Sequence, residues 1–111
     1  MELQGWWTKD EEGYMEFETS QLQRIYEATT DSYHNVYNDF LDEYDDEDEA
    51  HYKALALGYE MITDYKLING VEEFTTTYIT PSFIVDLWYD LDEDTGKRVY
   101  DKGYLRVIKK A

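Results

Sequence analysis

The densest group of charged side chains in this sequence is the run from Asp39 to Glu49. Eight of its eleven residues are carboxylates and none is basic. The wider window 27–52 holds ten acids and no lysine or arginine, so most of the net charge of −16 lies in one quarter of the chain. A surface of this kind repels nucleic acid and anionic membranes and attracts basic partners.

The spacing of these acids resembles the charge spacing of a nucleic acid. If the run is helical, with a rise of about 1.5 Å per residue, it carries one negative charge per roughly 2 Å of axis. Duplex DNA carries one per about 1.7 Å when both strands are counted. On one helix, Asp39, Asp42, Asp46 and Glu49 would share a side. The run is therefore interpreted as a functional negative surface.

The alternative interpretation is a passive, solvated helix face, but local rules weigh against it. Solvated faces usually mix signs, because Glu–Lys pairs four residues apart stabilise a helix, and the run has no lysine. Asp42, Glu43 and Asp45 also fall where a helix is expected to end, against the negative end of its dipole. Each such placement costs about 0.3–1 kcal/mol at low salt.

Aromatic side chains are interleaved with these acids. Tyrosines among carboxylates suit binding to a basic, partly apolar cleft, because buried aromatics dominate interface energies. The predicted partner-binding residues are Asp39, Asp42, Glu43, Asp45, Asp46, Asp48 and Glu49, together with Tyr37, Tyr44 and Tyr52.

Other candidates for chemistry are weaker. The stretch from Asp90 to Asp101 has the alternating acids of a calcium loop, but Thr95 stands where that loop needs glycine and Asp101 where it needs glutamate. A hairpin loop with Gly96 at positive φ explains it better. His34 and His51 are interpreted as surface residues. No catalytic motif is present, so no catalytic residue, metal or cofactor is predicted and the protein is not expected to be an enzyme.

Length and composition bound the class of protein. A chain of 111 residues with 42% apolar residues predicts one folded domain, 1–111. The nineteen aromatic residues argue against a disordered acidic tail. Neither a signal peptide nor a membrane-spanning run is recognisable, which favours a cytoplasmic protein.

The N-terminal half predicts a hairpin followed by helices. Leu3, Trp6 and Trp7 mark one short strand, and Tyr14 to Phe17 the next. Ser20, with Gln23 three residues on, predicts a capping box and a helix that runs to about Tyr44. The cap-forming residues 29–32 favour an interruption of that helix, although one continuous helix is the alternative.

The C-terminal half begins with a second predicted helix. Asp46 caps it, and Ala54, Leu57, Met61, Ile62 and Tyr65 form its apolar face, with Asn69-Gly70 as the stop. Strands are then predicted at 74–79, 83–89 and 98–108, the last bent near Gly103. The expected fold is α+β: two or three helices packed on an antiparallel sheet made of an N-terminal hairpin and a C-terminal three-stranded meander.

Small, cysteine-free, tyrosine-rich chains of this charge resemble the DNA-mimic inhibitors of phages and mobile elements, namely anti-CRISPR proteins, antirestriction proteins and uracil-DNA glycosylase inhibitors. The resemblance rests on the 39–49 run and on the acids between Asp10 and Glu18. It implies a non-enzymatic inhibitor, monomeric or homodimeric, in the cytoplasm of a bacterial host. Such a protein occupies the basic nucleic-acid-binding cleft of a CRISPR effector, a restriction enzyme or a similar enzyme.

Two other hypotheses remain open. One is a small acidic interaction or structural protein of a phage or plasmid, with contacts made by its aromatic sheet and by the basic residues of the last hairpin. Those residues are Lys97, Arg98, Lys102, Arg106, Lys109 and Lys110. The weakest is a divalent-cation protein that binds at Asp90–Asp101.

Overall fold

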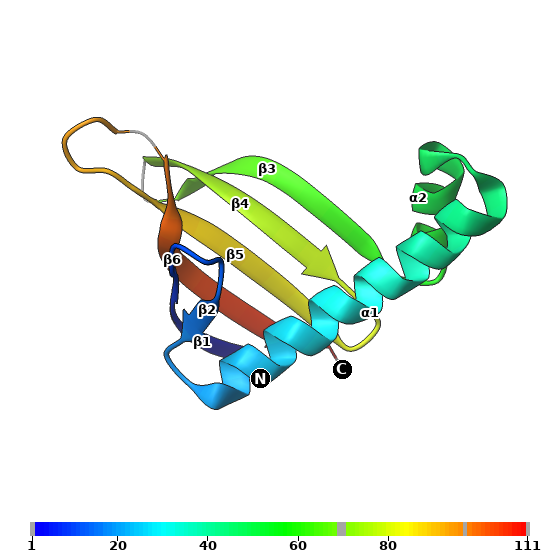
Figure 1. Ribbon diagram of the computed structural model, residues 1–111, viewed down its shortest axis with the longest axis horizontal. Coiled ribbons are helices and arrows are strands. Elements are labelled where there is room, and N and C mark those ends of the chain that lie inside the picture. The colour runs from blue at the N-terminus through cyan, green and yellow to red at the C-terminus, as the bar shows by residue number, and fades with distance from the viewer. Residues whose placement is uncertain (1, 69–70, 97, 111) are drawn as a thin grey trace.

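In the part of the chain that the structure describes, two helices pack on one face and beyond one end of a six-stranded antiparallel sheet (Figure 1). The computed structural model describes residues 2–68, 71–96 and 98–110, without the side chains of 64–68, 71–74 and 98. The elements in chain order are β1 (Glu2–Lys9), β2 (Met15–Phe17), α1 (Ser20–Tyr44), α2 (Glu47–Ala56), β3 (Glu60–Ile68), β4 (Val71–Ile79), β5 (Phe83–Leu91) and β6 (Arg98–Lys109).

The strand order β2-β1-β6-β5-β4-β3 joins the two ends of the chain in one sheet. β1 pairs with β6 from Glu2↔Ile108 to Thr8↔Lys102, so the N-terminal hairpin extends the C-terminal meander. The expected α+β class and antiparallel sheet are confirmed. The meander differs from expectation because it has four strands, β3 to β6, in the described part of the chain.

The core lies between α1 and the sheet face that α1 covers. Its centre is formed by one side chain of β1, one of α1 and two each of β5 and β6: Trp7, Leu22, Val85, Leu87, Leu105 and Val107. The paired residues Val85↔Val107 and Leu87↔Leu105 bring the β5 and β6 side chains together, since alternate residues share a face of a strand. Tyr26 and Tyr78 extend the apolar layer toward β4.

Helix α1 is continuous, so the expected interruption at 29–32 is wrong. Thr30 Oγ1 donates to the carbonyl oxygens of Tyr26 at 2.9 Å and Glu27 at 3.2 Å, so its hydroxyl is satisfied inside the helix. The cap is Thr19, whose hydroxyl accepts from the Leu22 N–H at 3.2 Å. The predicted Ser20–Gln23 capping box is therefore wrong: the cap lies one residue earlier, the apolar Leu22 cannot complete a box with it, and the Gln23 amide donates to the Glu27 carboxylate.

The second helix is shorter than expected. It ends at Ala56, and Gly58 follows at φ 90° with its N–H donating to the Leu55 carbonyl. The Tyr59 N–H donates to the Ala54 carbonyl at 2.9 Å, the long bond of a glycine-terminated helix end. Residues 60–68 then form β3, so the predicted helical face through Met61 and Ile62 is wrong. The predicted stop at Asn69-Gly70 lies outside the described residues.

The loop after β5 is the predicted hairpin connection. The Asp92 carboxylate accepts from the N–H groups of Asp94 at 2.8 Å and Thr95 at 3.1 Å. Gly96 has the expected positive φ, at 68°, and its N–H donates to the Asp92 carbonyl. This carboxylate therefore stabilises the turn itself. β6 runs through Gly103 as one strand.

An ion pair lies on the sheet face opposite α1. Asp86 is 2% exposed and accepts from Arg106 Nη2 at 2.7 Å and from the Thr77 hydroxyl at 2.5 Å. The Arg106 guanidinium also lies 5.0 Å from the centre of the Trp88 ring. Among the described residues, no helix is long and apolar enough to cross a membrane.

Candidate partner-binding surface

The C-terminal part of α1 and all of α2 extend past the sheet as a helical arm, defined here as residues 36–57 (Figure 1). Helix α1 has 25 residues and is therefore about 37 Å long. Six strands at about 4.8 Å spacing span only about 24 Å. The last buried residue of α1 is Tyr33, so the remaining turns find no sheet beneath them and pack against α2 instead.

A tight turn joins the two helices of the arm. Asp45 ends α1 in the left-handed conformation, at φ 51°, and its N–H donates to the Leu41 carbonyl at 2.8 Å. Asp46 then caps α2, as predicted, because its carboxylate accepts from the N–H groups of Asp48 at 2.8 Å and Glu49 at 3.2 Å. Ala50 and Ala54 are buried on the inner side of α2.

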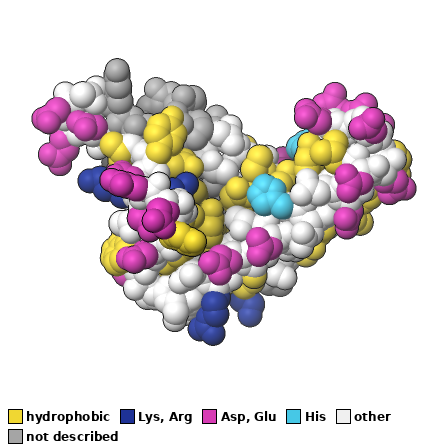
Figure 2. All heavy atoms as spheres, viewed as in Figure 1, with side chains coloured by type: hydrophobic (Ala, Val, Ile, Leu, Met, Phe, Trp, Pro, Cys, Tyr) yellow, Lys and Arg dark blue, Asp and Glu magenta, His cyan; other side chains and the backbone are white. Residues whose placement is uncertain are grey.

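All seven predicted acids are exposed, but they lie on two helices and the turn between them. Asp39, Asp42 and Glu43 belong to α1, whereas Asp48 and Glu49 belong to α2. The expected alignment of Asp39, Asp42, Asp46 and Glu49 along one helix is therefore wrong. Acidic side chains gather at the far end of the arm, as the space-filling view shows (Figure 2).

The helix dipoles divide the run into two groups. Glu47, Asp48 and Glu49 occupy the first turn of α2, where the positive end of the dipole favours carboxylates. Their presence therefore has a structural explanation that a single helix could not offer. Asp42 and Glu43 lack such an explanation, because they lie in the last turn of α1, which contains no basic residue. The unfavourable charges are thus confined to the end of α1.

The three predicted tyrosines differ in exposure. Tyr37 is half-buried and stacks on Tyr33, with ring centres 5.9 Å apart. Tyr44 is 41% exposed and Tyr52 is 66% exposed. Lys53 lies 5.5 Å from the centre of the Tyr44 ring, which is cation–π geometry. Tyr44 and Tyr52 are thus available to a partner, whereas Tyr37 mainly supports the arm.

Two exposed leucines of the arm were not predicted as site residues. Leu55 is 41% exposed and Leu57 is 57% exposed. The sequence pattern assigned Leu57 to the buried face of a longer helix, and the early end of α2 leaves it on the surface. The signal that could have found it is Gly58, a typical residue just beyond a helix end.

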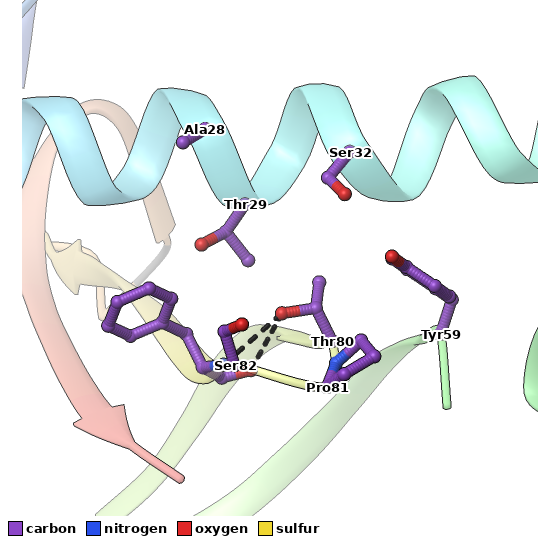
Figure 3. A pocket seen from close by; sticks show the side chains of 8 residues that line it. Ala28, Thr29, Ser32, Tyr59, Thr80, Pro81 and Ser82 are labelled. Atoms are coloured by element: carbon purple, nitrogen blue, oxygen red, sulfur yellow. Dashed lines mark hydrogen bonds between the residues drawn. The ribbon is translucent and has the colours of Figure 1, made fainter. Parts of the chain in front are cut away.

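A hydroxyl-lined pocket of about 180 Å³ lies between the middle of α1 and the connection from β4 to β5 (Figure 3). Thr29 and Ser32 contribute from α1, and Tyr59, Thr80 and Ser82 from the connections that flank β3–β4. Among the described residues, no charged side chain lines it. The Thr29 hydroxyl is buried without a hydrogen-bond partner, so a bound water is the simplest occupant beside it.

The histidines take part in aromatic contacts. The His34 ring lies 5.3 Å from that of Tyr33 and 5.9 Å from that of Tyr78, both edge-on. His51 contacts the Tyr52 ring at 5.5 Å. Within the described ranges, no three His, Asp or Glu side chains come together in a metal-binding arrangement.

Of the basic residues of the last hairpin whose side chains the structure describes, Lys102, Arg106 and Lys109 lie on β6 and Lys110 follows it. Arg106 is engaged by Asp86 on the sheet. Lys102 pairs in register with Thr8 of β1. The side chains of Lys97 and Arg98 lie outside the described residues.

The molecule is thus an α+β protein in which a sheet core carries a projecting acidic helical arm. Comparison with protein-family models, curated proteins and solved structures finds no match to this chain.

Proposed function

We propose that this protein is a non-enzymatic inhibitor whose helical arm occupies the basic nucleic-acid-binding cleft of a defence or DNA-processing enzyme. The observation that carries the proposal is the placement of Asp42 and Glu43 in the last turn of α1, without a basic side chain in that turn. Charges that disfavour their own helix are expected where binding, rather than folding, selects the residue. Asp39 adds a third exposed carboxylate one turn earlier.

The shape of the arm supports the same proposal. The molecule measures 46 × 31 × 28 Å, and the arm occupies one end of it. A projecting element can enter a cleft that a flat surface cannot reach. Its carboxylates stand in for phosphates and pair with lysine and arginine, while Tyr44 and Tyr52 pack between those contacts. Association is expected to be fast and to weaken steeply with salt.

The test is a pull-down from nuclease-treated bacterial lysate, eluted with a salt gradient and followed by mass spectrometry. The wild-type bait is expected to retain a nucleic-acid enzyme that added DNA or RNA displaces. The variant D39K/D42K/E43K is expected to lose it. The matched control E93K/D94K/D101K changes the net charge equally at exposed acids of the β5–β6 hairpin, and is expected to retain it.

Equal capture by both variants would show that the arm is not the binding surface. A partner indifferent to salt and nucleic acid would favour the second candidate, an accessory protein that binds through its sheet. Trp6 and Tyr104 support that candidate, because they pair in register on the face opposite α1 and are 44% and 39% exposed. W6Q would then abolish capture.

A further inference from the structure

Helix α2 has apolar side chains on the side that faces away from α1. Ala50 and Ala54 are buried on its inner side, at 0% and 1% exposure. At 100° per residue, Tyr52 lies opposite the midpoint of these two alanines and Leu55 lies beside it. Tyr52 and Leu55 form what is called here the outer face of α2, and are 66% and 41% exposed.

Apolar residues at these positions are unusual for a surface helix. Such a helix normally buries one apolar stripe and presents polar residues on the other side. Tyr52 and Leu55 are three residues apart on one helix and so expose neighbouring apolar side chains, whereas single exposed apolar residues are ordinary on protein surfaces. The net charge of −16 favours solubility, whereas exposed apolar side chains oppose it, so solubility does not explain why Tyr52 and Leu55 are exposed. The outer face therefore has the composition of an interface.

Carboxylates flank this face at its N-terminal end. Asp48 precedes Tyr52 by four residues and Glu49 precedes it by three, so both lie one turn away on the same helix. Asp48 and Glu49 are exposed, and Lys53, the one basic residue of α2, follows Glu49 by four residues, so the two carboxylates leave a net negative charge beside Tyr52. The surface thus presents apolar contacts and negative charge side by side.

We propose that the outer face of α2 binds a cationic amphipathic helix of the target protein. The inference rests on the proposed function and specifies the element of the target that the arm contacts. A helix with an apolar stripe packs against Tyr52 and Leu55, which are spaced by three residues as helix-packing ridges require. Lysines or arginines beside that stripe then reach Asp48 and Glu49. A segment with charge but no apolar stripe would leave the outer face exposed.

The two kinds of contact have separable effects. The carboxylates accelerate association and make it salt-dependent, because they act over distance. The apolar side chains act only on contact, so they slow dissociation and persist at high salt. Removal of Tyr52 and Leu55 should therefore weaken binding without reducing its salt dependence.

The test uses two fluorescent peptides of about 18 residues, or five helical turns, built from leucine and lysine. One places its leucines on a single helical stripe, and the other distributes the same residues around the helix. Binding to the full-length protein is measured by fluorescence anisotropy at about 0.15 M and 0.5 M salt. The variant Y52Q/L55Q keeps helix-compatible residues at both exposed positions. Its control is Y14Q, at a 70% exposed tyrosine in the β1–β2 turn.

Wild type and Y14Q are expected to bind the striped peptide at least about tenfold more tightly than the distributed one, a difference of about 1.4 kcal/mol. Y52Q/L55Q should bind both peptides equally. Equal binding of the peptides by wild type, no binding of either, or an undiminished preference in Y52Q/L55Q would overturn the inference. The proposed function would survive any of these results if D39K/D42K/E43K alone still lost the nucleic-acid enzyme in the pull-down.

Discussion

Trp7 and Gly103 face each other in the register of β1 and β6, and the indole of Trp7 fills the space that a side chain at position 103 would take. The Trp7 Nε1–H donates to the carbonyl oxygens of Trp88 at 3.1 Å and Tyr104 at 3.2 Å. One ring thus connects three strands. The Trp7 and Tyr89 rings also make a T-shaped contact, with ring centres 5.5 Å apart.

This arrangement predicts that G103A is severely destabilised. A Cβ at position 103 would fall on the Trp88 carbonyl oxygen and 2.8 Å from atoms of the Trp7 ring. Neither group can move without breaking the bond between them, so a loss of about 3 kcal/mol or more in the free energy of unfolding is expected. G13A is the control: its Cβ meets open space, and only the strain of φ 94° applies, about 1–2 kcal/mol. Urea denaturation measures both, and equal losses would contradict the packing argument.

The Asp86–Arg106 pair predicts a second stability effect. R106M removes a charge partner from a carboxylate that is 2% exposed, together with the cation contact to Trp88. A loss of about 2–3 kcal/mol is expected, because a buried charge is costly when a partner is removed. The matched control R24M lies on the exposed side of α1 and should stay within about 0.5 kcal/mol of wild type. A loss as small as that of R24M would show that Asp86 does not depend on Arg106.

Acids at the end of α1 and at the cap of α2 predict stability changes of opposite sign. D42K/E43K replaces unfavourable charges in the last turn of α1 and should raise stability by about 0.6–2 kcal/mol. D46A removes the cap of α2 and should lower it by about 1 kcal/mol. Thermal unfolding at low salt measures both changes. If D42K/E43K were less stable than wild type, the acids at the end of α1 would have a structural role and the argument for binding would weaken.

Buried tyrosines predict a loss of stability at alkaline pH. Burial raises the pKa of Tyr26, Tyr33 and Tyr78 above the ordinary value of 10.0, with neighbouring tyrosines adding to the effect. The folded state therefore holds its protons more strongly than the unfolded state. This stabilisation is fully present below pH 10 and is lost as pH rises from there toward the folded pKa values.

The melting temperature is therefore expected to fall above about pH 10. Y26F removes one ionisable group from the set and should flatten this decline, whereas Y14F, at an exposed tyrosine, should leave it unchanged. Identical pH profiles for wild type and Y26F would show that Tyr26 does not contribute.

The parts of the fold that follow from local signals were predictable from the sequence. Asp46 is a cap and Gly96 has positive φ because a short side chain and a missing Cβ satisfy those backbone positions locally. The alternating residues of β5 and β6 likewise predicted strands. The errors arose where local preference and tertiary packing disagree. Thr29 and Thr30 favour caps in isolation, but both are buried inside a continuous helix.

The boundary between α2 and β3 shows a different kind of error. Residues 57–65 fit a helical spacing, yet Gly58 stops the helix and Tyr78 of β4 pairs with Met61. The position of a helix end also limited the prediction of the site. Its acids could be recognised from composition, but their division between two helix ends depends on where α1 stops.

The separation of aromatic types between the sheet and the arm makes the two regions optically distinct. All three tryptophans lie on strands, at Trp6 and Trp7 of β1 and Trp88 of β5, whereas the arm has tyrosines and a phenylalanine but no tryptophan. Selective excitation of indole thus monitors the sheet alone. A tryptophan introduced at Tyr52, beside the proposed contact, would report arrival of a partner at the arm through an emission shift.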